Sequence, residues 1–245
     1  MRNPNLPIIT SREYVLQAGQ SVNLSSESAG MDGSITSTLE FSTFPAIDLS
    51  RNLNELIDYP YGCLEQTISR AFPQLFLKDL TNLSKADQDK IKAMVEIAIN
   101  KLPAFQNAEG WFSFWPGNRF EDQFTSMYAG QFMLEAKNAG YNVPQGSLES
   151  LLAVQKRAAR LWQPKQLRAG LYPHDADIEQ AFRLYMLALA GSPEIGAMNQ
   201  LKDLSSLSNP ARYYLSAAYS LSGKKNVGGA LIDKAEKESK PYREA

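Results

Sequence analysis

The sequence has little of what metal and disulfide sites need, since it contains one cysteine, Cys63, and one histidine, His174. A single cysteine excludes an intramolecular disulfide in any redox compartment. Zinc sites usually draw on several cysteine and histidine ligands, and carboxylates alone suit harder ions. We therefore expect neither a metal nor another cofactor.

An excess of charge of one sign is also missing. The chain has 25 Lys and Arg against 26 Asp and Glu, a net charge of −1. Without a basic excess, nucleic acid is not an expected partner. No apolar run approaches the roughly 20 residues that span a bilayer. The first residues, MRNPNLPIIT, lack the apolar run of a signal peptide, so the chain as written is expected in the cytoplasm.

The 245 residues, of which 44% are hydrophobic, suffice for one large domain or for one domain with an appendage. The first 47 are rich in Ser, Thr and Gly and show alternating runs at 14–16, 21–24 and 37–41, which predict strands. Two or three strands do not make a stable sheet alone. We expect these strands to pack against the helical part or to belong to a larger β-domain.

From residue 48 onward, apolar residues recur at helical spacing. Pro73 is expected to kink the second helix, and Ser84 to cap the third. The expected helices cover residues 48–59, 63–76, 87–102, 123–137, 148–161, 177–189, 210–221 and 227–238. Helices of similar length joined by short loops form hairpin arrays that close into bundles, solenoids or α/α toroids.

The stretch YPYGCLEQ, residues 59–66, contains the only cysteine. The ordinary interpretation of Cys63 is a small buried hydrophobic residue. A helix N-terminus, however, stabilises a thiolate through its free N–H groups. Gly62 allows close backbone approach, and Gln66, three residues on, falls on the same helix face as Cys63. A thiolate held against that amide can attack it, and loss of ammonia leaves a thioester, a stored acyl electrophile.

The run PYGCLEQ, residues 60–66, resembles the internal thioester motif Gly-Cys-x-Glu-Gln of the α2-macroglobulin and complement family, and YPYGCLEQTISRAFPQLFL resembles its bacterial form. Two further blocks, residues 110–144 and 177–191, resemble the aromatic loop and a later helix of that family's thioester domain. Residues 37–63 resemble the lead-in from its CUB-like β-sandwich. The resemblance covers nearly the whole chain.

The resemblance implies a mainly α fold, an α/α toroid of helical hairpins that is incomplete at its C-terminus. A partial CUB-like β segment, residues 1–47, would precede the toroid domain, residues 48–245. It also implies that Cys63 supplies the thioester sulfur and Gln66 the acyl carbon.

Bacterial members of the family are large extracytoplasmic protease traps, in which bait cleavage exposes the thioester to lysines of the protease. The implied partners are attacking proteases and other domains of the same chain. The implied activity is a single acyl transfer without turnover, in the periplasm or cell envelope rather than the cytoplasm.

Aromatic residues surround the motif in sequence. Tyr59 and Tyr61 precede Cys63, and a second cluster lies downstream at Trp111, Phe112, Phe114 and Trp115. Such rings pack in cores, and they also act as a screen that keeps water from a thioester; the two interpretations are compatible. Within the motif we expect Leu64 to face the core. Glu65 either stabilises the helix start or is solvated.

His174 lies in the loop LYPHDADI. Some complement components use a histidine to transfer the acyl group to hydroxyls, but His174 lies closer to the following helix than that role suggests. An exposed loop histidine is the simpler interpretation, and without a catalytic histidine the resemblance implies amines as targets.

Three alternatives remain at this point. One is a toroidal enzyme such as a prenyltransferase or terpene cyclase, but the sequence lacks the zinc ligands or aspartate-rich motif of those sites. Another is a cysteine hydrolase with a Cys63–His174 dyad, which needs the two side chains within hydrogen-bond distance. The third is a helical interaction module in which no thioester forms.

Overall fold

The computed structural model describes residues 10–25, 35, 37, 39, 41, 62–77, 83–163 and 175–238. The chain divides into two compact units, Met1–Arg51 and Asn52–Ala245.

The described part of the first unit contains no strand. A turn at 17–20 interrupts residues 10–25, where the Gln20 N–H donates to the Gln17 carbonyl oxygen at 3.0 Å. The strands expected at 14–16 and 21–24 are therefore absent, because an alternating run becomes a strand only when it pairs in a ladder. The run at 37–41 lies partly, and the helix at 48–59 wholly, outside the described residues. The CUB-like segment stays a prediction.

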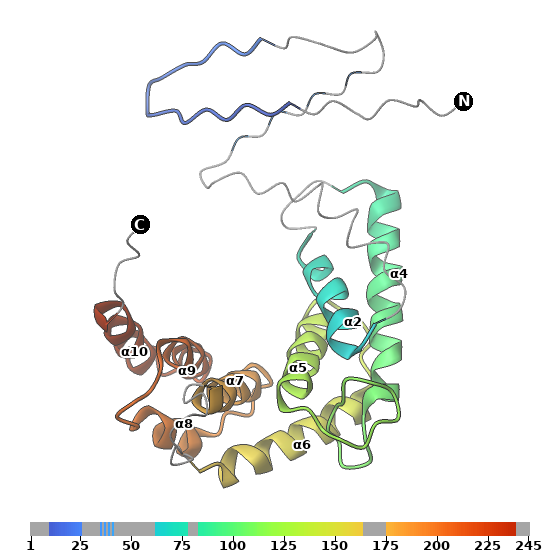
Figure 1. The fold of residues 1–245 in the computed structure, drawn as a ribbon, viewed down its shortest axis with the longest axis vertical. Helices are drawn as coiled ribbons and strands as arrows, with labels where there is room; N and C mark the ends of the chain where they lie inside the picture. The colour runs from blue at the N-terminus through green and yellow to red at the C-terminus, as the bar shows by residue number, and fades with distance from the viewer. Residues whose placement is uncertain are drawn as a thin grey trace. The chain divides into compact units, whose positions relative to one another are not determined.

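The described part of the second unit is mainly helical, as the apolar spacing predicts. Its α-helices are α2 (Leu64–Ala71), α4 (Lys85–Lys101), α5 (Gln123–Asn138), α6 (Gln145–Leu161), α7 (Asp175–Leu189), α8 (Ile195–Lys202), α9 (Asn209–Leu221) and α10 (Lys225–Glu238) (Figure 1). Two 3-10 helices are η1 (Pro73–Leu75) and η2 (Leu102–Phe105). Within these described ranges, no helix is long and apolar enough to cross a membrane.

The helices pack as two series. In the first series, α2, α5, α7 and α9 contact one another in that order. In the second series, α4 packs on α2, α6 packs on α5 and α7, α8 packs on α7 and α9, and α10 packs on α9. This alternation of helical hairpins is the arrangement of an α/α fold, and it leaves α2 at one end of the first series.

Local sequence explains most helix boundaries. Ser84 caps α4 as expected, and its hydroxyl accepts the Asp87 N–H at 3.2 Å. The predicted kink at Pro73 is wrong in detail, because α2 ends at Ala71 and the chain continues as the 3-10 turn η1. Proline lacks the N–H that a continuing α-helix needs. Helix α8 was not expected, and α6 and α7 begin two or three residues earlier than the spacing predicts.

Three helices of the first series end in the same way. The residue after the C-cap of α5, α7 and α9 is a glycine with positive φ: Gly140, Gly191 and Gly223. After α5, the Tyr141 N–H donates back to the Ala136 carbonyl oxygen at 2.9 Å, which is the Schellman geometry. Residues with a side chain are disfavoured at positive φ, whereas glycine adopts it readily. Each of these three helices therefore ends just before its glycine.

Aromatic rings connect the first series along its length. Phe72, just after α2, lies 5.7 Å from Tyr128 of α5, measured between ring centroids. Phe124 of α5 lies 5.9 Å from Phe182 of α7, and Phe182 lies 5.1 Å from Tyr214 of α9. Each interface of the first series therefore contains at least one pair of aromatic rings. Ring pairs at this separation contribute a favourable free energy beyond that of the apolar area they bury.

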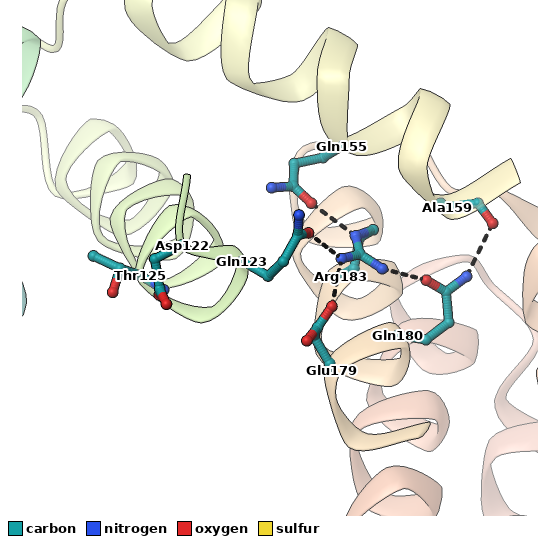
Figure 2. Close-up of polar contacts among 8 residues, drawn as sticks. All are labelled: Asp122, Gln123, Thr125, Gln155, Ala159, Glu179, Gln180 and Arg183. Atoms are coloured by element: carbon teal, nitrogen blue, oxygen red, sulfur yellow. Dashed lines mark hydrogen bonds and ion pairs between the residues drawn. The ribbon is translucent and has the colours of Figure 1, made fainter. Parts of the chain in front are cut away.

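A buried guanidinium joins α5, α6 and α7 (Figure 2). Arg183 of α7 donates to Gln155 Oε1 of α6 at 2.8 Å and to Gln123 Oε1 of α5 at 2.7 Å. Within α7 it also donates to Gln180 Oε1 at 2.6 Å and to Glu179 Oε1 at 3.0 Å. Burial lowers the pKa of the Arg183 guanidinium, and the Glu179 carboxylate opposes that shift. Figure 2 shows the four acceptors converging on this one side chain.

Candidate functional site

Cys63 and Gln66 meet over the first turn of α2. Cys63 is the N-cap residue, with extended backbone (φ −60°, ψ 172°), and its half-buried thiol is free. Its N–H donates to Gln66 Oε1 at 3.3 Å, while its side chain faces the backbone N–H of Gln66. The pair forms a capping box, in which each side chain serves the other residue's main chain. The Gln66 amide is thereby folded back toward the residue that carries the thiol.

Gly62 lies directly against that amide. A Cβ at this position would lie 2.5 Å from Gln66 Oε1 and 2.8 Å from Gln66 Cβ. Both distances are shorter than non-bonded atoms tolerate, so the folded-back Gln66 side chain requires that residue 62 have no side chain.

The loop of residues 106–122, called here the aromatic loop, reaches the start of α2. The Leu64 N–H donates to the Phe114 carbonyl oxygen at 2.9 Å, and Leu64 itself is fully buried. Phe114 thus satisfies one of the N–H groups that a helix leaves free at its N-terminus. The aromatic side chains differ in environment: Trp111 is buried, Phe114 is 40% exposed and Trp115 is 58% exposed. Of the predicted screen, only Phe114 has a described contact with the motif.

Two serines hold the aromatic loop. The buried hydroxyl of Ser126, in α5, accepts the Phe112 N–H at 2.8 Å and lies 3.1 Å from the Phe112 carbonyl oxygen, to which it can donate. Ser113 donates its hydroxyl to the Trp115 carbonyl oxygen at 2.8 Å. Neither serine was among the predicted site residues, although polar residues inside the apolar face of α5 are visible in the sequence. The contacts fix the main chain on either side of Phe114.

Glu65 points to a different set of partners. It is half-buried, and its Oε1 accepts the Ser69 hydroxyl at 3.0 Å. The Ser69 hydroxyl lies 3.2 Å from the Tyr128 hydroxyl of α5, so this chain of polar groups links α2 to α5. Glu65 was predicted as part of the motif, whereas Ser69 and Tyr128 were not predicted. These contacts give Glu65 a place in the packing of α2.

Three residues of the predicted site and its aromatic screen, Tyr59, Tyr61 and His174, lie outside the described residues. Among the residues that the structure does describe, no group of three His, Cys, Asp or Glu side chains is placed to hold a metal ion.

Comparison with known proteins decides the family. Residues 33–172, more than half of the chain, match the model of the A-macroglobulin TED domain. The chain belongs to this family. The Gly-Cys-Leu-Glu-Gln run, residues 62–66, lies within the matched range. The mainly helical arrangement of α2–α10 agrees with the fold of a solved Escherichia coli alpha-2-macroglobulin, with a TM-score of 0.64 and 26% identity.

Relatives of this TED domain are bacterial proteins many times its length. It is 30% identical over 215 residues to the alpha-2-macroglobulin of Xylella fastidiosa strain Temecula1, covering 83% of this chain and 13% of that protein. It resembles Salmonella alpha-2-macroglobulin reacted with methylamine, with a TM-score of 0.65 and 27% identity, over 78% of this chain and 13% of that one. Trypsin-activated alpha-2-macroglobulin from Escherichia coli has a TM-score of 0.60 and 26% identity, over 73% of this chain and 13% of that one.

Proposed function

We propose that this TED domain forms an internal thioester between Cys63 Sγ and Gln66 Cδ and uses it to acylate an amine. The observation that supports this proposal is the folded-back Gln66 side chain, whose Oε1 accepts the Cys63 N–H beside a residue with no Cβ. Bringing the two groups together on one helical turn makes the reaction intramolecular, which favours it by entropy.

Formation of the thioester balances without a further reactant. Cys63 Sγ attacks Gln66 Cδ, a carbon–sulfur bond forms, and the carbonyl electron pair moves onto Oε1. When the carbonyl re-forms, the Cδ–Nε2 bond breaks, and the nitrogen leaves as ammonia with the proton of the thiol. An attacking amine then forms an amide bond to Cδ, and its proton passes to the departing Cys63 sulfur. One acyl group is consumed for each molecule, so the domain acts once and does not turn over.

For the whole protein, we propose a protease trap in the bacterial cell envelope. The relatives are named alpha-2-macroglobulins, and one solved relative was activated by trypsin. In this proposal the thioester couples to lysines of the attacking protease, and other domains of the same chain are its further partners. Amines are the expected targets, and methylamine, with which a Salmonella relative was reacted, is a suitable model nucleophile.

The test is intact mass of freshly purified protein with and without methylamine, with Cys63→Ser and Gln66→Met as matched controls. The expected result is a mass lower by one ammonia, followed by methylamine uptake mapped to Gln66, and neither change in the two variants. Iodoacetamide should label Cys63 only after methylamine has opened the thioester. An unmodified mass with immediate labelling of Cys63 would refute the proposal for this chain and favour an interaction module without thioester chemistry.

A further inference from the structure

We propose that the backbone N–H of Cys63 is the oxyanion donor for acyl transfer at Gln66, and that Gly62 is a positioning residue that makes room for the acyl oxygen. This inference deepens the proposed thioester function and rests on it. It assigns a role in the reaction to a main-chain group and gives Gly62 a spatial rather than a conformational purpose.

The backbone at Gly62 shows that conformation is not the reason for a glycine. Gly62 is not among the positive-φ glycines of the described chain, so an L-residue could adopt its backbone. Space is the restriction instead, because a Cβ would lie 2.5 Å from Gln66 Oε1 and 3.4 Å from Gln66 Cδ. The volume that a methyl group would fill is occupied by the oxygen of the reacting amide.

The contacts of α2 direct one N–H to that oxygen. The Leu64 N–H is already committed to the Phe114 carbonyl oxygen at 2.9 Å, and the Gln66 N–H faces the Cys63 side chain. The Cys63 N–H donates to Gln66 Oε1 at 3.3 Å. The aromatic loop therefore accepts the hydrogen bond of the Leu64 N–H. The N–H of Cys63 donates to the Gln66 side-chain carbonyl, which is the group that the Cys63 thiol attacks.

The chemistry requires a donor at this place. As the Sγ–Cδ bond forms, negative charge develops on Oε1, and the present 3.3 Å separation can shorten toward the roughly 2.7–3.1 Å of an oxyanion contact. Only Nε2 leaves in the first reaction and only Sγ in the second. Because Oε1 stays on Cδ throughout, the same N–H stabilises both tetrahedral intermediates.

The first test compares Gly62→Ala with Gly196→Ala, in the full 245-residue chain. Gly196 is an exposed glycine of α8 around which no atom lies within 4 Å of an added Cβ, so it is the matched control. We expect Gly62→Ala to slow ammonia loss and methylamine uptake about 100-fold, as removal of one oxyanion donor does elsewhere. Gly196→Ala should react as wild type, and both variants should keep the wild-type helical circular dichroism.

The second test does not depend on thioester formation. Amide hydrogen exchange of Cys63, measured by mass spectrometry or NMR, should be about tenfold faster in Gly62→Ala and in Gln66→Met than in wild type, because the added methyl group displaces the acceptor oxygen and Gln66→Met removes it. Equal exchange in all three proteins would overturn the inference. So would a Gly62→Ala variant that forms the thioester at the wild-type rate. A wild-type chain that loses no ammonia refutes the proposed function instead, and the exchange measurement still decides the hydrogen bond.

Discussion

Replacing Arg183 by methionine should destabilise the domain strongly without touching the thioester pair. Methionine replaces the unbranched stem of the arginine side chain but provides none of the four hydrogen bonds that Arg183 donates. The acceptors come from α5, α6 and α7, so the substitution removes the polar contact that three helices share (Figure 2).

The size of the effect follows from which acceptors remain buried. Gln155 and Gln180 are fully buried, and each loses the partner of its side-chain oxygen. A buried acceptor left unpaired costs about 1–3 kcal/mol, so the two together cost about 2–6 kcal/mol. Gln123 and Glu179 are partly exposed and can be hydrated. Part of the cost is offset because a guanidinium no longer has to be desolvated, and we expect a net loss of about 2–4 kcal/mol.

The measurement is the free energy of unfolding from urea denaturation, with circular dichroism as the signal. The m-value should be the same for the variant and the wild type. The matched control is Arg157→Met on α6, which removes the same charge from an exposed position and should change stability by at most about 0.5 kcal/mol. If Arg183→Met is no more destabilising than Arg157→Met, the four hydrogen bonds are balanced by desolvation and the reasoning is refuted.

Two further predictions concern buried hydroxyls. Ser126→Ala should lower the free energy of unfolding by about 2 kcal/mol, because the Phe112 N–H loses a buried acceptor, and a change within error in thermal unfolding would contradict this. Burial raises the pKa of Tyr219 to about 12 from 10.0, so the folded state keeps a phenol proton that the unfolded state loses. Stability should therefore fall by about 2–3 kcal/mol as the pH rises from 10 to 12. In Tyr219→Phe this decrease in stability between pH 10 and pH 12 should be missing. Parallel profiles of stability against pH for the two proteins would contradict the prediction.

The sequence predicted those parts of the fold that short-range chemistry determines. Ser84 was expected as a cap, and short loops were expected between the helices, where Gly140, Gly191 and Gly223 lie. Helix α8 was missed because it has only eight residues and includes Gly196, so its apolar spacing is too brief to distinguish it from a loop. The strands expected at 14–16 and 21–24 depend on pairing, which an alternating pattern alone cannot supply.

At the site, the same division between local and long-range chemistry holds. Cys63 and Gln66 lie three residues apart, so they can meet through a local capping box at the start of one helix. The contact of Leu64 with Phe114 joins segments far apart in sequence, and no periodicity predicts it. Arg183 lies in the block 177–191 that carried part of the resemblance, yet its partners Gln155 and Gln123 lie 28 and 60 residues away. Hydrogen bonds of that range are decided by how whole helices pack.

The order of contacts in the first series has a mechanical consequence. Because α2, α5, α7 and α9 contact mainly their immediate neighbours, a pulling force on the chain is carried by one interface after another along the buried core. Detachment of α10 and α9 from the far end would leave the interface between α2 and α5 in place. A domain built in this way gives way in steps when stretched, and the turn that carries Cys63 and Gln66 lies at the end opposite to α10.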